Sequence, residues 1–249
     1  MDCMEGMKQF PNKFFDLAIV DPPYGAGFTE NGGCKGWFTK YHQDTEKDKN
    51  IGTHFHGRGR SKRYVERYNS DDDGISNSDR KKKVIGWDTA PPPEYFDELF
   101  RVSKNQIIWG GNYFSLPPTR CFLVWKKHIP ENFTMAMCEY AWTSFNANAK
   151  VFEKASQDPN RFHPTQKPVA LYSWILSNYA KDGDIILDTH VGSGSSLVAC
   201  EKMGFQYVGY EIDETYYKKA KERIETERAQ LNLFRAEDAL EQQIEFEGV

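Results

Sequence analysis

The sequence predicts an α/β fold, a mostly parallel sheet doubly wound with helices, and two features of the chain indicate it. Short runs of β-branched and aromatic residues alternate with longer amphipathic segments, which is the pattern of strands connected by helices. Two of the apolar runs lead directly into polar turns that contain proline or glycine, as strands do where an open α/β sheet binds its ligand.

Each element is placed by its own residues. Strands are expected where apolar runs are short and rich in β-branched or aromatic residues, and helices where the apolar period is longer. Pro168 is expected at the start of a helix, where its missing backbone N–H removes no hydrogen bond. The predicted strands are 15–20, 105–109, 121–125, 139–143, 184–187 and 206–210, and the predicted helices are 94–103, 168–179, 195–203 and 214 to about 231.

The stretch 25–90 interrupts this alternation. It is rich in Gly, Asn, Asp, Lys and Arg, with GRGR at 57–60 and DDDG at 71–74, and nothing in it resembles a core segment. A loop of this length inside a compact domain is usually either functional or disordered. The sequence therefore predicts a catalytic domain formed by residues 1–24 and 91–249, and a flexible insertion at 25–90 that contacts a partner.

The composition indicates a cytoplasmic protein whose cysteines are reduced. The charged fraction is 27%, the mean hydropathy is -0.71, and neither a membrane span nor a signal peptide is recognisable. The five cysteines lie far apart and form no CxxC pair, so free thiols are expected. His54 and His56 have no third ligand nearby, so no metal site is expected.

Basic residues are concentrated in the predicted insertion, although the net charge is -4 and the pI about 5.9. Such a cluster suits contacts to DNA phosphates, and its arginines suit guanine edges; a merely solvated loop has the same composition. The segment 131–161, which contains Trp142, is a second candidate for base contacts. The basic cluster consists of Arg58, Arg60, Lys62, Arg63 and Arg67.

A first candidate site follows the strand predicted at 15–20 and consists of Asp21, Pro22, Pro23 and Tyr24. The two prolines remove backbone donors and stiffen the turn, which leaves the Asp21 carboxylate and the Pro22 carbonyl as fixed acceptors beside the Tyr24 ring. Acceptors next to an aromatic face suit a planar base that carries an amine. The same residues also fit a strand-ending turn with a buried tyrosine.

A second candidate site is the segment DTHVGSGSS at 188–196, which follows a strand and opens a helix. Gly192 and Gly194 let the backbone approach a ligand at the helix N-terminus, and Glu211 at the end of the next strand is placed to hold ribose hydroxyls. A dinucleotide fits less well, because Leu197 occupies the third glycine position of GxGxxG and the Asp21 turn has no task in hydride transfer. S-adenosylmethionine fits better.

Together these motifs resemble those of the DNA amino-methyltransferases, in which DPPY is the catalytic motif and D-P-F-x-G-S-G-T-T is the cofactor loop. Here DPPY precedes HPTQKP at 163–168 and then the glycine loop, an order that resembles the permuted beta subgroup. The resemblance implies a Rossmann-like methyltransferase fold with circularly permuted motifs. It covers roughly 2–24 and 94–225, and the insertion lies outside it.

The resemblance implies a role for each motif. Asp21 and the Pro22 carbonyl would accept hydrogen bonds from the target amine, and Tyr24 would stack on the base. The cofactor would be S-adenosylmethionine, with Glu211 on its ribose and Asp2, an acidic position upstream of DPPY, on its adenine. The glycine-loop residues implied to contact the cofactor are Asp188, His190, Gly192, Gly194 and Ser195. The HPTQKP residues implied to lie beside the cofactor's carboxylate are His163, Thr165, Gln166 and Lys167.

The glycine loop departs from the family pattern at two pairs of residues. Thr189 and His190 replace the usual Pro and Phe, and Ser195 and Ser196 replace two threonines. The loss of the phenyl ring at position 190 predicts weaker cofactor binding or inactivity, although the imidazole of His190 is still planar. A role for His190 as catalytic base is not expected, because the target amine needs polarising and not deep deprotonation.

The interpretation that follows is a methyltransferase that flips a base out of double-stranded DNA and methylates its exocyclic amine. Asp21 favours N6 of adenine, since the family usually has aspartate at this position with adenine and serine with cytosine. The alternatives are an N4-cytosine enzyme, a catalytically impaired DNA-binding relative, and a methyltransferase of RNA or a protein amide. The recognition sequence, a homodimer and a cognate restriction nuclease are left open.

Overall fold

In the computed structural model, the described residues are 1–25, 89–131, 136–156 and 161–247, the last of these with residues 234–247 as helical backbone alone. The chain divides into two compact units, one formed by Met1–Pro22 with Pro91–Val249 and the other by Pro23–Ala90. All helices and strands given below belong to the first unit.

The first unit is built on a seven-stranded sheet with the order β5-β3-β4-β2-β1-β6-β7. Among these strands, β4 runs antiparallel to both of its neighbours, and the other pairs are parallel. The mostly parallel sheet expected from the sequence is therefore confirmed. The strands are β1 (Phe15–Val20), β2 (Ser103–Trp109), β3 (Phe122–Lys126), β4 (Cys138–Thr143), β5 (Lys150–Glu153), β6 (Ile185–Asp188) and β7 (Gln206–Gly209).

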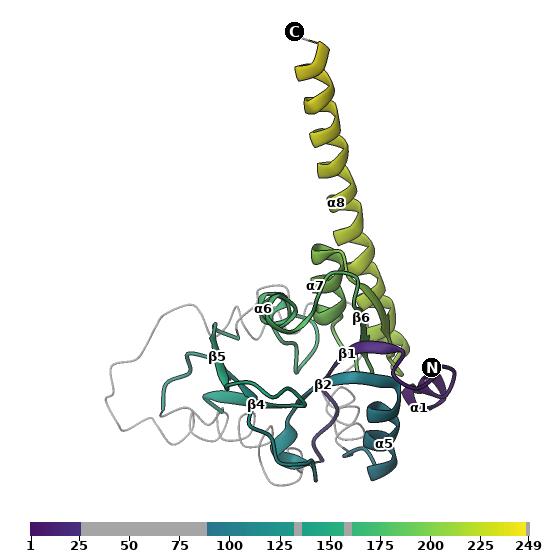
Figure 1. Ribbon diagram of the computed structural model, residues 1–249. Helices are drawn as coiled ribbons and strands as arrows, with labels where there is room; N and C mark the ends of the chain where they lie inside the picture. The colour runs from purple at the N-terminus through teal and green to yellow at the C-terminus, as the bar shows by residue number, and fades with distance from the viewer. Residues whose placement is uncertain (26–88, 132–135, 157–160, 248–249) are drawn as a thin grey trace. The chain divides into compact units, whose positions relative to one another are not determined.

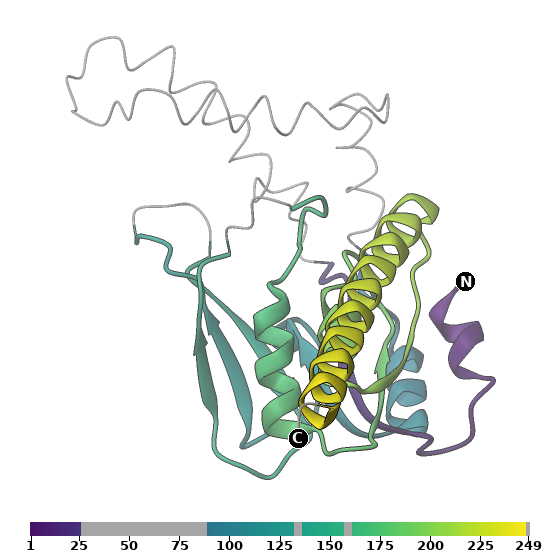
Figure 2. The same ribbon diagram turned by 90° about the horizontal axis from the view of Figure 1, so that it is seen from above.

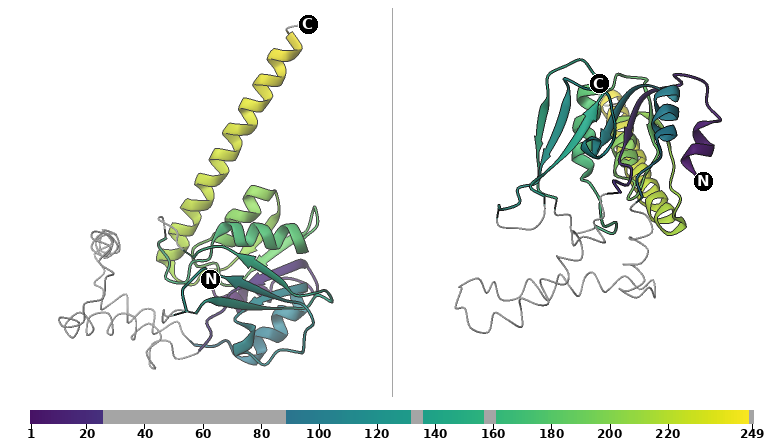
Figure 3. Two further views of the ribbon diagram at one scale, coloured as in Figure 1. Left: turned by 90° about the vertical axis from the view of Figure 1, so that its left-hand side faces the viewer. Right: turned by 90° about the horizontal axis from the view of Figure 1, so that it is seen from below.

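Helices cover both faces of this sheet, as Figure 1 shows. On one face lie α6 (Val169–Tyr179) and α7 (Ser195–Met203); on the other lie α1 (Cys3–Met7) and α5 (Pro93–Val102), seen in the right panel of Figure 3. The alternation of side chains along β1 explains both layers, because Leu17 and Ile19 pack with the first pair of helices and Ala18 and Val20 with the second. The doubly wound α/β architecture is confirmed.

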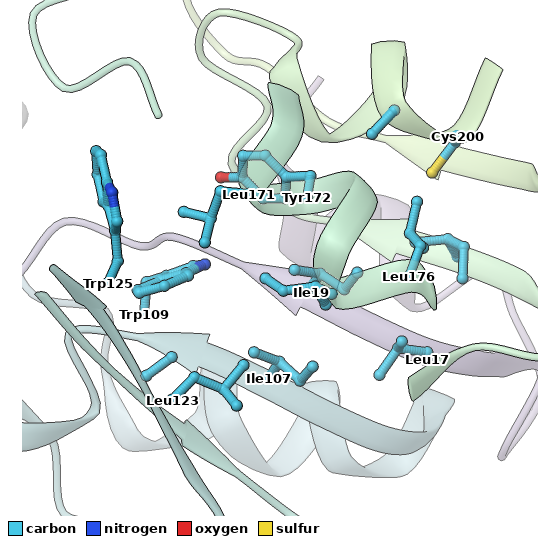
Figure 4. Packing of buried hydrophobic residues seen from close by; sticks show 14 residues of the cluster. Leu17, Ile19, Ile107, Trp109, Leu123, Trp125, Leu171, Tyr172, Leu176 and Cys200 are labelled. Atoms are coloured by element: carbon cyan, nitrogen blue, oxygen red, sulfur yellow. The ribbon is translucent and has the colours of Figure 1, made fainter. Parts of the chain in front are cut away.

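The larger core cluster lies between α6 and the sheet. Figure 4 shows Leu171 and Leu176 of α6 above Ile19 and Ile107, all of them buried. At one end of this cluster Trp109 and Trp125 are also fully buried, at the ends of β2 and β3. The core therefore continues to the edge of the sheet at which β1 and β2 end.

The last helix, α8 (Glu214–Glu247), extends well beyond the end predicted near residue 231. Its Ala220 packs on Val191 and Leu197 next to α7, and Figure 2 shows α8 and α6 on the same side of the sheet. The residues that prolong it are mostly Ala, Leu, Glu, Gln and Arg, which have high helix propensity.

Three elements were missing from the sequence prediction. Strand β5, helix α1 and the 3-10 turn η2 (Gly111–Tyr113) are all short, and KVFE in β5 carries only a weak strand pattern. Among the described cysteines, Cys3, Cys121, Cys138 and Cys200 have free thiols, and Cys34 lies outside the described residues. Within the described part of the chain, every helix is too short or too polar to traverse a lipid bilayer.

Candidate active site

The two candidate motifs meet at one edge of the sheet. Strand β1 pairs in parallel with β6, with Leu17 opposite Ile186 and Ala18 opposite Leu187. Asp21 follows β1 and Asp188 ends β6, so both carboxylates lie at the carboxyl ends of adjacent strands. In open α/β sheets this is the edge at which ligands bind.

The Asp21 carboxylate is held by a buried lysine. Lys167 Nζ forms an ion pair with Asp21 Oδ2 and lies 3.0 Å from Glu139 Oε2. The side chain of Lys167 is 2% exposed, against 16% for Asp21. The two carboxylates raise the pKa of Lys167 although burial alone would lower it, so the lysine carries its charge inside the fold.

Glu139 extends this pair into a cluster of four charges, which we call the Asp21 cluster: Asp21, Lys167, Glu139 and Lys127. Lys127 Nζ pairs with Glu139 Oε1. Burial alone would raise the pKa of Glu139, but the charges and hydrogen bonds of Lys167 and Lys127 lower it to about 2. Two carboxylates thus face two ammonium groups, and the cluster is neutral overall.

Trp109 forms an apolar wall of the same cluster. Its ring centroid lies 5.2 Å from Lys167 Nζ, within the range of a cation–π contact. Trp109 is completely buried, and β2 places it next to β1. The lysine is therefore confined by an aromatic face as well as by carboxylates.

The glycine loop is shaped by positive φ angles and by Glu211. Gly192 and Gly194 have φ of 53° and 76°, in the left-handed region that glycine tolerates best. Glu211 Oε2 accepts a hydrogen bond from Gly192 N, and Oε1 accepts one from Asp213 N, both at 2.8 Å. Glu211 thus fixes the loop after β6 to the loop after β7.

Asp188 is held by neutral donors. His190 N donates to Asp188 Oδ1 at 2.9 Å, and the Ser196 hydroxyl donates to Oδ2. Burial raises the pKa of Asp188 to about 7, and the nearby charges of Asp21 and Glu211 act in the same direction. This carboxyl therefore differs from Asp21, which is paired with a buried lysine.

A residue of α8 fixes the start of α7. Arg223 Nη1 donates to Ser193 O at 3.0 Å and to Ser195 Oγ at 2.9 Å. The Ser193 and Ser195 hydroxyls are 3.0 Å apart and both residues are buried. The predicted cofactor residue Ser195 thus lies in the loop, held by an arginine that the sequence interpretation did not include.

The HPTQKP segment connects the two motifs. A Cβ built on Gly192 would lie 3.3 Å from the His163 ring, so the ring closes over the glycine loop. Thr165 Oγ1 is 3.2 Å from His163 Nδ1, and Gln166 Oε1 accepts from Phe162 N at 3.3 Å. Lys167, at the other end, points to Asp21. One short segment therefore contacts both the predicted cofactor loop and the predicted catalytic carboxylate.

Asp2 and His190 lie on the α1 and α5 side of the loop. Asp2 caps α1 by accepting a hydrogen bond from Met4 N at 2.8 Å. Burial lowers the pKa of His190 to about 4, and the charge of Asp2 acts in the opposite direction. Thr189 Oγ1 lies 2.6 Å from Tyr95 Oη and 2.9 Å from His190 Nδ1. The two residues that depart from the family pattern are thus bonded to each other and to α5.

The other predicted site residues are divided by the boundary between the units. Pro22 is buried at the end of the first unit's initial segment, whereas Pro23 and Tyr24 belong to the second. The predicted DNA contacts Arg58, Arg60, Lys62, Arg63 and Arg67 lie outside the described residues.

Lys127, Glu139, Tyr95 and Arg223 were absent from the sequence interpretation. Tyr95 and Arg223 meet their partners across elements far apart in the chain. The register of the consecutive strands β3 and β4 brings Lys127 and Glu139 together. A lone lysine or glutamate in a strand-forming stretch carries no signal of this kind.

Comparison with known proteins gives a family. The family model described as DNA methylase, N6_N4_Mtase, matches residues 60–222. The YubD protein of Escherichia coli K12, named as a methylase, is 33% identical over 247 residues, which cover 90% of this chain and 87% of YubD. The family match begins at residue 60, so the expectation that all of 25–90 lies outside the family was wrong.

Two type II methyltransferases match over a shorter stretch. M.HpaI of Haemophilus parainfluenzae and M2.DpnII of Streptococcus pneumoniae are each 42% identical over 65 residues, 26% of this chain. The chain spans only 21% and 24% of the lengths of these two relatives.

Two solved structures share the fold. The complex of M1.HpyAVI with SAM has a TM-score of 0.50 at 18% identity, covering 90% of this chain and 96% of that one. The PvuII cytosine-N4-specific DNA methyltransferase has a TM-score of 0.52 at 9% identity, covering 92% and 90%. The matched family model and the likeness to YubD over most of both chains lead to one conclusion: this chain belongs to the N6/N4 family of DNA methylases.

Proposed function

We propose that this protein transfers the methyl group of S-adenosylmethionine to N6 of adenine in double-stranded DNA. The observation that carries the proposal is the Asp21 carboxylate, which a buried lysine holds at the edge of the sheet beside the glycine loop. Family membership supports the methyl transfer, and the geometry supports the assignment of roles.

The cofactor is S-adenosylmethionine, which when bound supplies an electrophilic methyl group on a sulfonium. The glycine loop suits it, because Gly192 and Gly194 present backbone without side chains at the N-terminus of α7. Glu211 keeps acceptor capacity for ribose hydroxyls, since a carboxylate accepts about four hydrogen bonds and the loop amides of Gly192 and Asp213 donate two. Gly192, Gly194, Ser195, His163 and Glu211 would therefore line the site.

Asp21 and the Pro22 carbonyl are proposed to accept hydrogen bonds from the target amine. An aromatic amine is a poor nucleophile because its lone pair is delocalised into the ring. Two fixed acceptors hold the nitrogen as it becomes tetrahedral and stabilise the positive charge that develops on it. We assign Lys167 to the positioning of Asp21, because its buried ammonium group is paired with that carboxylate. Tyr24 would stack on the flipped base.

Adenine is proposed over cytosine on one ground, the aspartate at the first position of DPPY. Adenine N6 and cytosine N4 are both conjugated exocyclic amines and would donate to the same acceptors. The likeness to a cytosine-N4-specific structure at 9% identity concerns the fold alone. The choice between the two bases therefore depends on a product analysis.

The decisive experiment is methyl transfer from labelled S-adenosylmethionine to duplex DNA, followed by digestion to nucleosides and mass spectrometry. N6-methyl-2′-deoxyadenosine as the main product supports the proposal. N4-methylcytosine would replace adenine by cytosine and leave the roles of Asp21 and Pro22 in place. DNA binding without transfer would favour an impaired relative, for which the Thr189 and His190 substitutions are the specific observation, and transfer only to RNA or protein would overturn the substrate class.

The DNA contacts are proposed to come from the basic cluster Arg58, Arg60, Lys62, Arg63 and Arg67, for which the support is sequence alone. Replacing Arg58, Arg60, Lys62 and Arg63 by alanine should weaken DNA binding, and the slope of log K against log salt should flatten by about 0.9 for each lost phosphate contact. Affinity for S-adenosylmethionine should stay unchanged. An unaltered salt slope would mean that the basic cluster does not touch DNA.

A further inference from the structure

Three side chains form a hydrogen-bonded chain behind the glycine loop. The Tyr95 hydroxyl of α5 lies 2.6 Å from Thr189 Oγ1, which in turn lies 2.9 Å from His190 Nδ1. Tyr95 is 1% exposed and Thr189 3% exposed, so water has no access to either hydroxyl. The rings of Tyr95 and His190 meet edge to face at 5.5 Å. Both residues that depart from the family's D-P-F pattern belong to this chain.

The protons in this chain can be assigned by counting donors and acceptors. If His190 Nδ1 carried a proton and donated to Thr189, then either the Thr189 or the Tyr95 hydroxyl proton would be left without an acceptor among the described residues. A buried hydroxyl that donates to nothing costs free energy. If Tyr95 donates to Thr189 and Thr189 donates to His190 Nδ1, both protons are used. The Nδ1 atom is then an acceptor, and the ring proton is on Nε2.

The protein does not fully enclose the His190 ring. His190 is partly exposed, and in the described part of the chain its Nε2 has no hydrogen-bond partner. Burial lowers the pKa of His190 to about 4, so the ring is neutral near pH 7. Asp2, whose carboxylate acts electrostatically on this ring, is the residue proposed to contact the adenine of the cofactor.

We infer that Thr189, whose hydroxyl accepts from Tyr95, fixes His190 as a neutral Nε2–H donor for a ring nitrogen of the cofactor's adenine; this rests on the proposed function. The chemistry matches adenine from both sides, since a carboxylate accepts from its exocyclic amine and an N–H donates to a ring nitrogen. Where the family pattern has a phenyl ring, this chain would have a planar ring with one directed donor. The Thr189–His190 pair is then a working substitute for the usual residues.

The first test reads the tautomer directly in the ligand-free protein. Nitrogen-15 NMR of the His190 side chain should show one protonated Nε2 and one unprotonated Nδ1. Thr189→Val removes the donor to Nδ1 and should give shifts averaged between the two tautomers, whereas Tyr95→Phe should keep the wild-type pattern because Thr189 can still donate. Thr226→Val, the same change on an exposed turn of α8, is the matched control. A protonated Nδ1 in the wild type would overturn the inference.

The second test uses S-adenosylhomocysteine and its 1-deaza, 3-deaza and 7-deaza analogues, in each of which carbon replaces one ring nitrogen. The wild type should bind one of the three about tenfold more weakly than the parent compound, because an N–H donor is then left unpaired. His190→Phe keeps a planar ring without the donor, so it should bind that analogue and the parent compound equally.

The outcomes separate this inference from the proposed function. If all three analogues bind the wild type as tightly as the parent compound, the inference is wrong while cofactor binding stands. If S-adenosylhomocysteine itself does not bind the wild type, the proposed function is wrong, and the assignment of adenine as the ligand of His190 fails with it.

Discussion

Two carboxylates at the same edge of the sheet are held in opposite ways. Asp21, at the end of β1, is paired with buried Lys167, which is itself paired with Glu139. Asp188, at the end of the adjacent β6, accepts from a backbone amide and a serine hydroxyl. A buried cation keeps a neighbouring carboxylate ionised, whereas neutral donors do not offset the cost of burying a charge.

This difference corresponds to the roles proposed for the Asp21 cluster and for the glycine loop. The Asp21 cluster holds one charged acceptor rigidly, which suits a group that must aim at a substrate amine. The glycine loop is organised by amides, hydroxyls and the Glu211 carboxylate, which suits the recognition of a nucleoside. Four predictions would break or sharpen the comparison.

The largest effect is expected for Lys167→Met. This change leaves Asp21 and Glu139 close together without their shared cation, and breaking a buried ion pair costs about 3–5 kcal/mol of stability. Urea unfolding should measure that loss. Lys150→Met, an exposed lysine on β5 bonded to Asn178, is the control and should change stability by less than about 0.5 kcal/mol. A loss no larger than that of the control would show that Lys167 does not hold the cluster together.

Asp21→Asn should abolish methyl transfer while leaving cofactor affinity nearly intact. The variant keeps the shape of the side chain but loses the negative charge opposite the developing positive charge on nitrogen, a loss that typically costs about 100-fold or more in turnover. Calorimetry with S-adenosylmethionine and a transfer assay measure the two quantities separately. Turnover above about 10% of the wild type would refute the role of Asp21.

The sequence predicted the elements that carry strong local patterns. Strand β1 has the predicted bounds, since FDLAIV is apolar on both faces, as a central strand of a doubly wound sheet must be. The antiparallel direction of β4 was not predicted, because the side-chain pattern of a strand does not record its direction. Strand β5 was missed because four residues with two charged ends carry too little of any pattern.

For the candidate site, the sequence predicted motifs but not how they are joined. Asp21 and the glycine loop were found because strand, turn and helix are consecutive in the chain. Lys167 was predicted beside the cofactor's carboxylate with the rest of HPTQKP, yet its ammonium group pairs with Asp21. The contacts of Glu139 with Lys127 and of Tyr95 with Thr189 depend on strand register and helix packing, which no local pattern encodes.

Glu211→Gln should weaken cofactor binding by about tenfold, because a charge-assisted hydrogen bond to a ribose hydroxyl becomes a neutral one. The single amide oxygen can accept from only one of the two backbone amides, Gly192 N or Asp213 N, so one of the two hydrogen bonds that fix the loop is lost as well. Calorimetry measures the dissociation constant for S-adenosylmethionine, and Glu222→Gln on the exposed face of α8 is the control. An unchanged constant would remove Glu211 from the proposed cofactor site.

The last prediction concerns the pH dependence of stability, which should have opposite signs for Glu139 and Asp188. The pKa of Glu139 is lowered to about 2, below its ordinary value of 4.5, so its contribution is present above pH 4.5 and is lost as the pH falls towards 2. The pKa of Asp188 is raised from 3.8 to about 7, so the folded state holds a proton that the unfolded state has released, and stability falls as the pH rises from 3.8 to 7. Each group contributes a slope of at most about 1.4 kcal/mol per pH unit. The measurement is the unfolding free energy of the ligand-free protein between pH 3 and pH 8. In Glu139→Gln, stability should no longer rise with pH on the acid side. In Asp188→Asn, stability should no longer fall as the pH approaches neutrality. If Asp188→Asn left that fall unchanged, burial would not be what sets the protonation of Asp188, and the contrast between a cation-paired and a neutrally bonded carboxylate would lose its physical basis.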